Sequence, residues 1–303
     1  MRRIANRVEV LANLCAATEA AAAVQAGAEG CGLLRTEFLF MERPAPPSVT
    51  DQLDSLQAIA DALAGRPLTI RTLDIGSDKP AAWAHLLAEG NPALGLRGVR
   101  VSIAQPDLFR QQLEAVVRLR SSSHVRLMLP MVSDLSDLRA ARAILDQVAR
   151  EHGVTAPSLG VMIETPSAAV LADQMADEAD FFSIGTNDLT QYALAMDRTH
   201  PDLAARLDAA HPAVLRLVRM VVEGASRRGR PVAVCGALAS EPHGAALLVG
   251  LGVTELSCAS SRIPDIKRTL RAQSLSALRA MADASLKLDS ADAVRALAAE
   301  TLA

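Results

Sequence analysis

Eight short apolar segments recur along the chain, and stretches with the spacing of amphipathic helices separate most of them. The expected strands are 8–13, 31–37, 68–74, 125–131, 159–164, 181–184, 232–237 and 255–258. The first expected helix ends near residue 25, and the tail from 263 is helical and rich in alanine. The other expected helices span 51–65, 106–120, 135–151, 167–178, 189–196, 212–228 and 241–251. This alternation predicts a (β/α)8 TIM barrel of parallel strands. An open doubly wound sheet has a similar alternation, so periodicity alone leaves it as an alternative.

The length of 303 residues suits one α/β barrel or two ordinary domains. We expect the short, basic segment 1–7 to be a linker remnant and residues 8–303 to form a single barrel domain. The stretch 76–100 interrupts the alternation of strands and helices with a long connection. Connections of this length in a compact domain usually carry function.

Composition excludes several classes of protein. The net charge is −3, and aromatic residues make up only 2% of the chain, which argues against a nucleic-acid surface built on base stacking. No apolar run approaches the ~18 residues of a spanning helix, so we expect no membrane insertion. The four cysteines have no CxxC spacing, which argues against a disulfide framework or a zinc site and favours a reducing cytoplasm. They are Cys15, Cys31, Cys235 and Cys258.

Cationic side chains stand at or near the carboxyl ends of several expected strands. In a parallel barrel these ends converge on one face, where catalytic groups are displayed. Arginine's planar fork binds carboxylate and phosphate groups through two hydrogen bonds, so four arginines and one lysine predict a ligand that carries both groups. These residues are Arg35, Arg71, Arg97, Arg198 and Lys79.

Acidic and amide side chains follow two neighbouring strands. Glu164 and Asp188 are hard oxygen donors, and two carboxylates that are completed by ligand oxygens and water are a common way to hold Mg²⁺. Asn187 stands beside them in the sequence, and Cys235 is a candidate proton donor at the same rim. Taken singly, these residues have simpler explanations: Glu164 as a helix cap, Asn187-Asp188 as the N-cap of a helix at 189–196, and Cys235 as a small core residue. A lone arginine is commonly a surface ion-pair partner. It is their occurrence on successive strands that favours a site.

The segments that carry these residues resemble a known family, the phosphoenolpyruvate-binding domain of Enzyme I, the phosphoenolpyruvate-protein phosphotransferase of the bacterial sugar phosphotransferase system. The similar segments are GLLRTEFLFMER (32–43), IRTLDIGSDKP (70–80), NPALGLRGVR (91–100), LMLPMVS (127–133), GVMIETPSAA (160–169), FFSIGTNDLTQYALAMDR (181–198) and VCGALAS (234–240). They lie in the family's order between about residues 13 and 265. Pyruvate phosphate dikinase and phosphoenolpyruvate synthase share the barrel and several of these motifs.

The resemblance implies roles for individual residues. Arg35, Arg71, Arg97 and Lys79 would hold the phosphate and neighbouring oxygens. Two acids, an amide, one further arginine and a thiol complete the implied set. Glu164 and Asp188 would ligate Mg²⁺, Asn187 and Arg198 would complete the grip on phosphate and carboxylate, and Cys235 would protonate the enolate carbon to give pyruvate.

The resemblance also implies partners: a swivelling phosphohistidine domain, the phosphocarrier HPr and a second copy in a homodimer. None of the six histidines has the glycine-rich Thr-Ser-His context of the phosphorylated residue, so we expect the acceptor histidine on a separate domain; the six are His85, His124, His152, His200, His211 and His243. The pairs His200-Pro201 and His211-Pro212 are expected to start helices.

Two positions depart from the family's pattern. Ser77 replaces a glycine, and Ala237 stands where the family usually has glutamate, which puts in doubt how Cys235 is tuned. The Cys-Gly-x-Leu-Ala-Ser form is similar to the Enzyme I portion of fused multiphosphoryl transfer proteins. A phosphoenolpyruvate-sensing module without turnover, a dikinase or synthase, and a carbon–carbon lyase of the same barrel superfamily stay open as alternatives.

Overall fold

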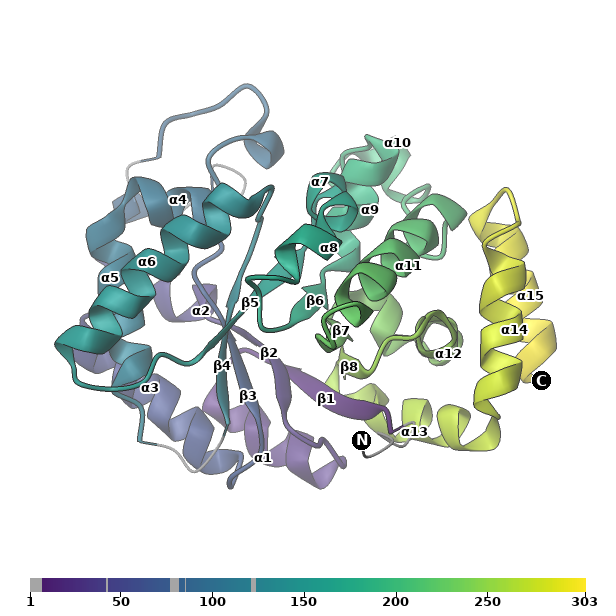
Figure 1. Cartoon of the computed structure of the whole chain (residues 1–303), viewed down its shortest axis with the longest axis horizontal. Helices are drawn as coiled ribbons and strands as arrows, with labels where there is room; N and C mark the ends of the chain where they lie inside the picture. The colour runs from purple at the N-terminus through teal and green to yellow at the C-terminus, as the bar shows by residue number, and fades with distance from the viewer. Residues whose placement is uncertain (1–6, 42, 77–81, 85, 121–123) are drawn as a thin grey trace.

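The fold is that of a computed structural model, which describes residues 7–41, 43–76, 82–84, 86–120 and 124–303. In these residues, eight parallel strands pair in chain order and close into a barrel (Figure 1). The strands are β1 (Glu9–Leu14), β2 (Cys31–Arg35), β3 (Leu68–Arg71), β4 (Val125–Leu129), β5 (Ser158–Ile163), β6 (Phe182–Ile184), β7 (Val232–Val234) and β8 (Glu255–Cys258). Closure by pairing of β1 with β8, from Glu9↔Glu255 to Ala12↔Cys258, confirms the barrel and excludes the open sheet.

Helices surround the barrel and extend beyond it at the carboxyl end of the chain. The α-helices are α1 (Ala17–Gln25), α2 (Glu37–Phe40), α3 (Val49–Ala62), α4 (Val99–Ala104), α5 (Pro106–Val117), α6 (Leu135–Glu151), α7 (Pro166–Val170), α8 (Ala172–Met175), α9 (Thr186–Leu194), α10 (Pro201–Ala204), α11 (Pro212–Ser226), α12 (Pro242–Leu251), α13 (Ile263–Ala272), α14 (Leu275–Ser285) and α15 (Ala291–Leu302). Four 3₁₀ turns among the described residues are η1 (Ala82–Ala84), η2 (Pro92–Leu94), η3 (Ala237–Ser240) and η4 (Ser260–Arg262). No helix in the described ranges is long and apolar enough to cross a membrane.

Four expected strands are too long by two or three residues. The expected ends were Glu37, Asp74, Met131 and Ala237, but β2, β3, β4 and β7 end at Arg35, Arg71, Leu129 and Val234. At β2 the cause is local, because Thr36 already has helical backbone angles (φ −78°, ψ −18°) and begins α2. The polar residues after these strands therefore lie on turns at the rim, where their side chains are not bound to the alternation of a strand.

Two expected helices also differ. The helix expected at 189–196 begins at Thr186, so Asn187 and Asp188 lie in its first turn and the N-cap is Gly185. The interpretation of Asn187-Asp188 as an N-cap is therefore wrong. The helix expected at 167–178 is two short helices, because Leu171 between α7 and α8 has backbone angles (φ −90°, ψ 10°) away from the α-helical region. Both helices that were expected to start at His-Pro pairs do so, with the imidazole Nδ1 of His200 and of His211 accepting a backbone N–H in the first turn.

The core is aliphatic, as the low aromatic content requires. Leucine, valine, isoleucine and alanine from all eight strands and the surrounding helices form one continuous cluster. Most of α12 is buried, because α14 and α15 cover the side that faces away from the barrel. A methyl group on Gly250 would collide with the backbone of Leu278, so this glycine allows α12 and α14 to lie in close contact. The helices α14 and α15 thus form a further layer on the outer side of α12 (Figure 1).

Candidate functional site

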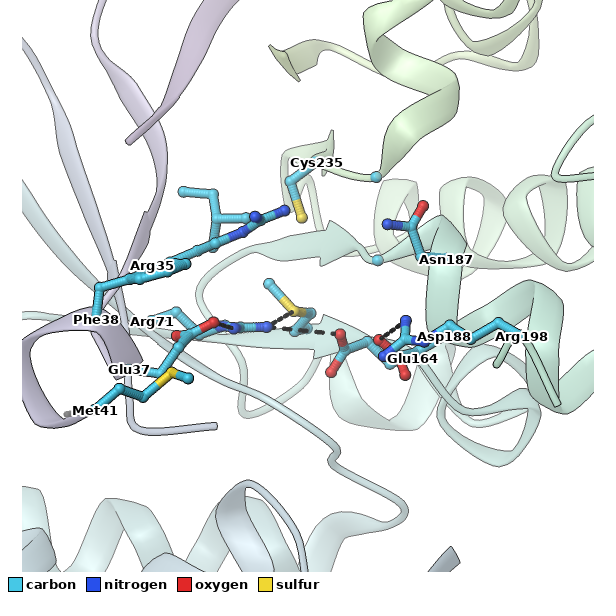
Figure 2. Close-up of a pocket in the computed structure, with 14 residues that line it drawn as sticks. Arg35, Glu37, Phe38, Met41, Arg71, Glu164, Asn187, Asp188, Arg198 and Cys235 are labelled. Atoms are coloured by element: carbon cyan, nitrogen blue, oxygen red, sulfur yellow. Dashed lines mark hydrogen bonds and ion pairs between the residues drawn. The ribbon is translucent and has the colours of Figure 1, made fainter. Parts of the chain in front are cut away.

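A cavity of about 490 Å³ opens at the carboxyl ends of the strands. Seven of the nine residues predicted from the sequence line it, and they come from β2, β3, β5, α9, β7 and the connections that follow them. These seven are Arg35, Arg71, Glu164, Asn187, Asp188, Arg198 and Cys235. Figure 2 shows their side chains directed toward a common space. Stretches that are up to 200 residues apart in the sequence (35 to 235) thus meet at one face, as expected for a parallel barrel.

The two carboxylates lie beside one another in opposite electrostatic settings (Figure 2). Burial raises the pKa of Glu164, and the negative charges of Asp188 and Asp74 raise it further. Burial also opposes the ionisation of Asp188, but the Arg97 guanidinium outweighs it and holds the pKa of Asp188 below its usual range. The backbone N–H of Met131 donates to Glu164 Oε2 at 3.0 Å. Arg71 Nη1 lies 3.9 Å from Glu164 Oε1, but the charges of Arg71 and Arg97 do not outweigh burial and the two neighbouring acids. A buried carboxyl group with a raised pKa therefore lines the cavity beside an ionised one.

This donor set fits a hard divalent cation. Two carboxylates leave coordination positions that ligand oxygens and water fill, which is how Mg²⁺ is commonly bound. Among the described residues, no group of three His, Cys, Asp or Glu side chains is arranged around one point. A cation here would thus have the carboxylates of Glu164 and Asp188 as its protein ligands, with water or ligand oxygens filling the other positions, and its charge would favour the ionised form of Glu164.

Behind the cavity, a buried ion-pair cluster links two of the predicted arginines. Asp74 accepts from Arg71 Nη1 at 3.1 Å and from Arg97 Nε at 3.1 Å. Arg71 also pairs with Glu37 at 2.5 Å. Burial disfavours both guanidinium charges, but the neighbouring carboxylates outweigh it and raise the pKa of Arg71 and of Arg97. Both arginines are consequently held as fixed positive charges.

Glu37 and Asp74 are the last residues of the expected strands 31–37 and 68–74, and the sequence predicted no role for either. Their spacing from the arginines was the available signal, since Asp74 lies three residues after Arg71 and Glu37 two residues after Arg35. Two buried atoms in this cluster, Glu37 Oε2 and Arg71 Nε, have no hydrogen-bond partner among the described residues. Arg71 Nε is therefore a donor that a ligand in the cavity would satisfy.

Arg97 and Lys79 differ from the other predicted residues. Arg97 is fully buried and does not line the cavity; its Nη1 donates to Asp188 Oδ1 at 2.8 Å. Arg97 therefore contacts the site through the carboxylate of Asp188. Lys79 and Ser77 lie outside the described residues. The roles of both cations stay predictions.

Asn187 and Arg198 present donors to the cavity. Asn187 Oδ1 accepts from the backbone N–H of Ala237 at 3.0 Å, which leaves its amide NH₂ free to donate. Arg198 Nη1 lies 3.2 Å from Asp188 Oδ2, and about a third of its side chain is exposed. Arg35 is half-buried and extends across the cavity toward Cys235 (Figure 2).

Cys235 is buried immediately after β7, with its thiol at the cavity wall. Burial raises the pKa of the Cys235 thiol to about 11, so the thiol is neutral and carries a proton at physiological pH. Its thiol approaches the carbonyl of Ile184 at 3.7 Å, and the Asn13 amide donates to the Cys235 carbonyl at 3.1 Å. A protonated thiol held in this way can donate a proton to a carbanion-like carbon in the cavity.

Comparison with known proteins identifies the family of the chain. Residues 3–275 match the family described as "PEP-utilising enzyme, PEP-binding domain". The chain is 46% identical over 296 residues to the multiphosphoryl transfer protein of Xanthomonas campestris pv. campestris, covering 97% of this chain and 35% of that protein. It is 37% identical over 303 residues to the phosphoenolpyruvate-protein phosphotransferase of Haemophilus influenzae, covering 98% of this chain and 53% of that protein.

The chain thus spans about a third to a half of the length of these relatives. Among solved structures, a malate synthase of Haloferax volcanii in a magnesium and glyoxylate complex is similar in fold, with a TM-score of 0.56 and 14% identity over 88% of this chain and 76% of that one. That likeness supports the barrel architecture alone. The family match over most of the chain, together with the cavity that its motifs build, shows that this chain belongs to the phosphoenolpyruvate-binding domain family of PEP-utilising enzymes.

Proposed function

We propose that this chain is the phosphoenolpyruvate- and Mg²⁺-binding barrel of a phosphoenolpyruvate-protein phosphotransferase, which passes the phosphoryl group to a histidine on a separate domain and releases pyruvate. The observation that supports this most is that one cavity holds guanidinium groups, a pair of carboxylates and a neutral thiol. Each matches one part of the ligand or of the reaction. The arginines suit phosphate and carboxylate, the two acids suit a hard cation, and the thiol suits protonation of an enolate.

We assign each residue of the cavity a role in binding the ligand or the metal. Arg35 and Arg71 would bind the phosphate, and Arg198 with the Asn187 amide would complete the grip on phosphate and carboxylate. Glu164 and Asp188 would hold Mg²⁺, which supplies Lewis-acid stabilisation of negative charge when bound. Arg97 and Lys79 remain candidates for the phosphate through the family's motif.

The proton and electron balance is simple. The bond between phosphorus and the enol oxygen breaks, its electron pair stays on that oxygen, and the incoming histidine nitrogen takes the phosphoryl group. The enolate that remains takes the Cys235 proton at C3, which gives pyruvate and a thiolate that solvent reprotonates. Because its pKa is raised, the Cys235 thiol is fully protonated and ready to donate at neutral pH.

The proposed acceptor is a histidine on another domain. None of the described histidines, 124, 152, 200, 211 and 243, lines the cavity, and His85 lies outside the described residues. A swivelling phosphohistidine domain and the phosphocarrier HPr are the expected partners, in a cytoplasmic sugar-uptake system, with the barrel as a homodimer. These assignments rest on the relatives and on the family's motifs.

Calorimetry tests the binding. Phosphoenolpyruvate should bind when Mg²⁺ is present, and Glu164→Ala or Asp188→Ala should weaken that binding by at least about tenfold, the effect of removing one metal ligand. Glu178→Ala, which removes an exposed carboxylate from a surface ion pair with Arg139, is the control and should bind normally. Normal binding by both cavity variants would defeat the metal assignment.

One observation favours a second candidate, a phosphoenolpyruvate sensor without turnover. Ala237 replaces the glutamate that usually follows Cys-Gly in the family, and its backbone N–H donates to Asn187 Oδ1. Supplying a phosphohistidine domain in trans and measuring pyruvate separates the two functions. Binding without any pyruvate would favour the sensor.

A further inference from the structure

Gln112 is a buried polar residue on the outer helix α5, and its side chain reaches the rim of the barrel between β2 and β3. Its Oε1 accepts from the backbone N–H of Leu73 at 3.0 Å. Its Nε2 donates to the Thr36 hydroxyl at 3.1 Å, and that hydroxyl donates to the carbonyl of Arg71 at 2.8 Å. Gln112 and Thr36 are almost completely buried, so these hydrogen bonds do not compete with water.

This chain of hydrogen bonds begins where the ladder between the strands stops. The last pair between β2 and β3 is Arg35↔Arg71, after which Thr36 turns into α2. On the opposite side, the N–H of Thr72 still donates to the Met128 carbonyl of β4 at 2.9 Å. The carbonyl of Arg71 and the N–H of Leu73 would otherwise be left unpaired in a dry interior. Gln112 and Thr36 satisfy both groups and thereby continue the connection between the two strand ends.

The two strand ends that are joined in this way carry two of the cavity arginines. Arg35 immediately precedes Thr36, and Arg71 supplies one of the bonded carbonyls. Because a guanidinium fork recognises phosphate only in a narrow geometry, small shifts of these backbones move the donors away from the ligand. Gln112 itself does not line the cavity.

We propose that Gln112 is a positioning residue, which together with Thr36 sets the separation and orientation of Arg35 and Arg71 for the phosphate. This inference rests on the proposed function of the cavity. A positioning role differs from a general contribution to stability in its effect on binding. Binding of the phosphorylated ligand should depend on Gln112, whereas binding of the metal should not. The metal acids Glu164 and Asp188 follow β5 and β6 on another part of the rim.

The test uses three variants. Gln112→Met keeps the length of the side chain and removes both of its hydrogen bonds, and Thr36→Val removes the hydroxyl while keeping the shape of the side chain. Gln147→Met is the matched control, since this glutamine lies on the neighbouring helix α6 and bonds only to exposed Glu151 among the described residues. Calorimetry measures phosphoenolpyruvate affinity at saturating Mg²⁺, and electron paramagnetic resonance measures binding of Mn²⁺ alone as the metal probe.

We expect Gln112→Met to weaken phosphoenolpyruvate binding at least about tenfold, and Mn²⁺ binding to stay within about twofold of the parent chain. Hydrogen exchange at the Leu73 amide should accelerate. Thr36→Val should give a smaller loss, and the double variant should lose less than the sum of the two because both residues act in one network. Thr36→Val alone decides the matter if Gln112→Met does not fold.

Two results would overturn the inference while leaving the proposed function intact: unchanged phosphoenolpyruvate binding in both variants, or an equal loss of ligand and metal binding. A parent chain that binds Mn²⁺ but no phosphoenolpyruvate would instead refute the proposed function, and the positioning role with it.

Discussion

Asp74→Asn is the substitution that best tests the electrostatic design of the site. Asp74 is completely buried, and among the described residues two arginines approach its oxygens in three contacts. Oδ1 receives Arg97 Nε at 3.1 Å, and Oδ2 receives Arg97 Nη2 at 3.2 Å and Arg71 Nη1 at 3.1 Å. Asparagine keeps the shape but offers one acceptor oxygen and a donor NH₂. In either orientation of the amide, at least one guanidinium donor then faces another donor.

The magnitude follows from this geometry. Removing one partner from a buried ion pair costs ~3–5 kcal/mol, and asparagine should lie near the lower end because it retains one acceptor. For a chain of 303 residues, the entropy of unfolding is roughly 0.6 kcal/mol per kelvin. A loss of about 3 kcal/mol therefore lowers the melting temperature by about 5 °C. Arg71 keeps its pairing with Glu37 but loses its alignment, so phosphoenolpyruvate binding should weaken by at least about tenfold.

Scanning calorimetry and isothermal titration of the same preparations give both quantities. Asp283→Asn is the control, because Asp283 also pairs with an arginine, Arg219 at 2.6 Å, but its side chain is largely exposed. Exposed pairs contribute little to stability, and this variant should melt and bind like the parent chain. If Asp74→Asn melts together with Asp283→Asn and binds phosphoenolpyruvate normally, the buried cluster does not hold the arginines and the reasoning fails.

Three further outcomes are expected. A methyl group on Gly185 would lie 2.7 Å from the side chain of Glu164, so Gly185→Ala should weaken Mn²⁺ binding measured by paramagnetic resonance. Gly90→Ala is the control, because a methyl group there meets nothing within 4 Å, and it should bind Mn²⁺ normally. Equal Mn²⁺ affinities of the two variants would contradict the close contact at Gly185. Iodoacetamide should leave Cys235 largely unmodified at about pH 8 and react faster as the pH approaches the thiol pKa of about 11, as followed by peptide mass spectrometry; a rate that is already maximal near neutrality would show a thiolate instead. Burial raises the pKa of Glu164, so the folded chain favours the neutral form of this carboxyl group. The free energy of unfolding of the metal-free chain, measured with denaturant, should therefore fall as the pH rises from the ordinary carboxylate range through the raised pKa of Glu164. Glu164→Gln should reduce that slope, and an unchanged slope would mean that another group causes it.

The sequence predicted the barrel and most of the cavity for a simple physical reason. Parallel strands bring their carboxyl ends to one face, so a charged residue just after an apolar run can be placed without knowing any side-chain conformation. That logic located Arg35, Glu164 and Asp188 on the cavity correctly. It did not anticipate that Arg97 is fully buried behind Asp188, because which charged groups pair with one another depends on side-chain geometry.

The ends of the strands were harder to predict than their existence. Apolar character continues past the last ladder pair of β3, but beyond Arg71 the N–H of Leu73 donates to the side chain of Gln112, a residue 41 positions after Arg71 on a helix. Such partners are non-local, so no pattern around residues 68–74 contains them. Polar residues on the inner face of an expected outer helix, such as Gln112 among the buried positions of α5, are the signal that could have been used.

Ala237 shows how a departure from a family's pattern can leave a site intact. The contribution of this position to the cavity is its N–H, which fixes the amide of Asn187, and any residue except proline supplies that donor. The neutral state of the Cys235 thiol results first from burial and not from a neighbouring side chain at 237. Restoring the glutamate would add a carboxylate near a thiol whose pKa the charge of Glu164 already raises. A further negative charge close to the thiol would raise that pKa again, so a glutamate at 237 is not needed to keep Cys235 protonated at neutral pH.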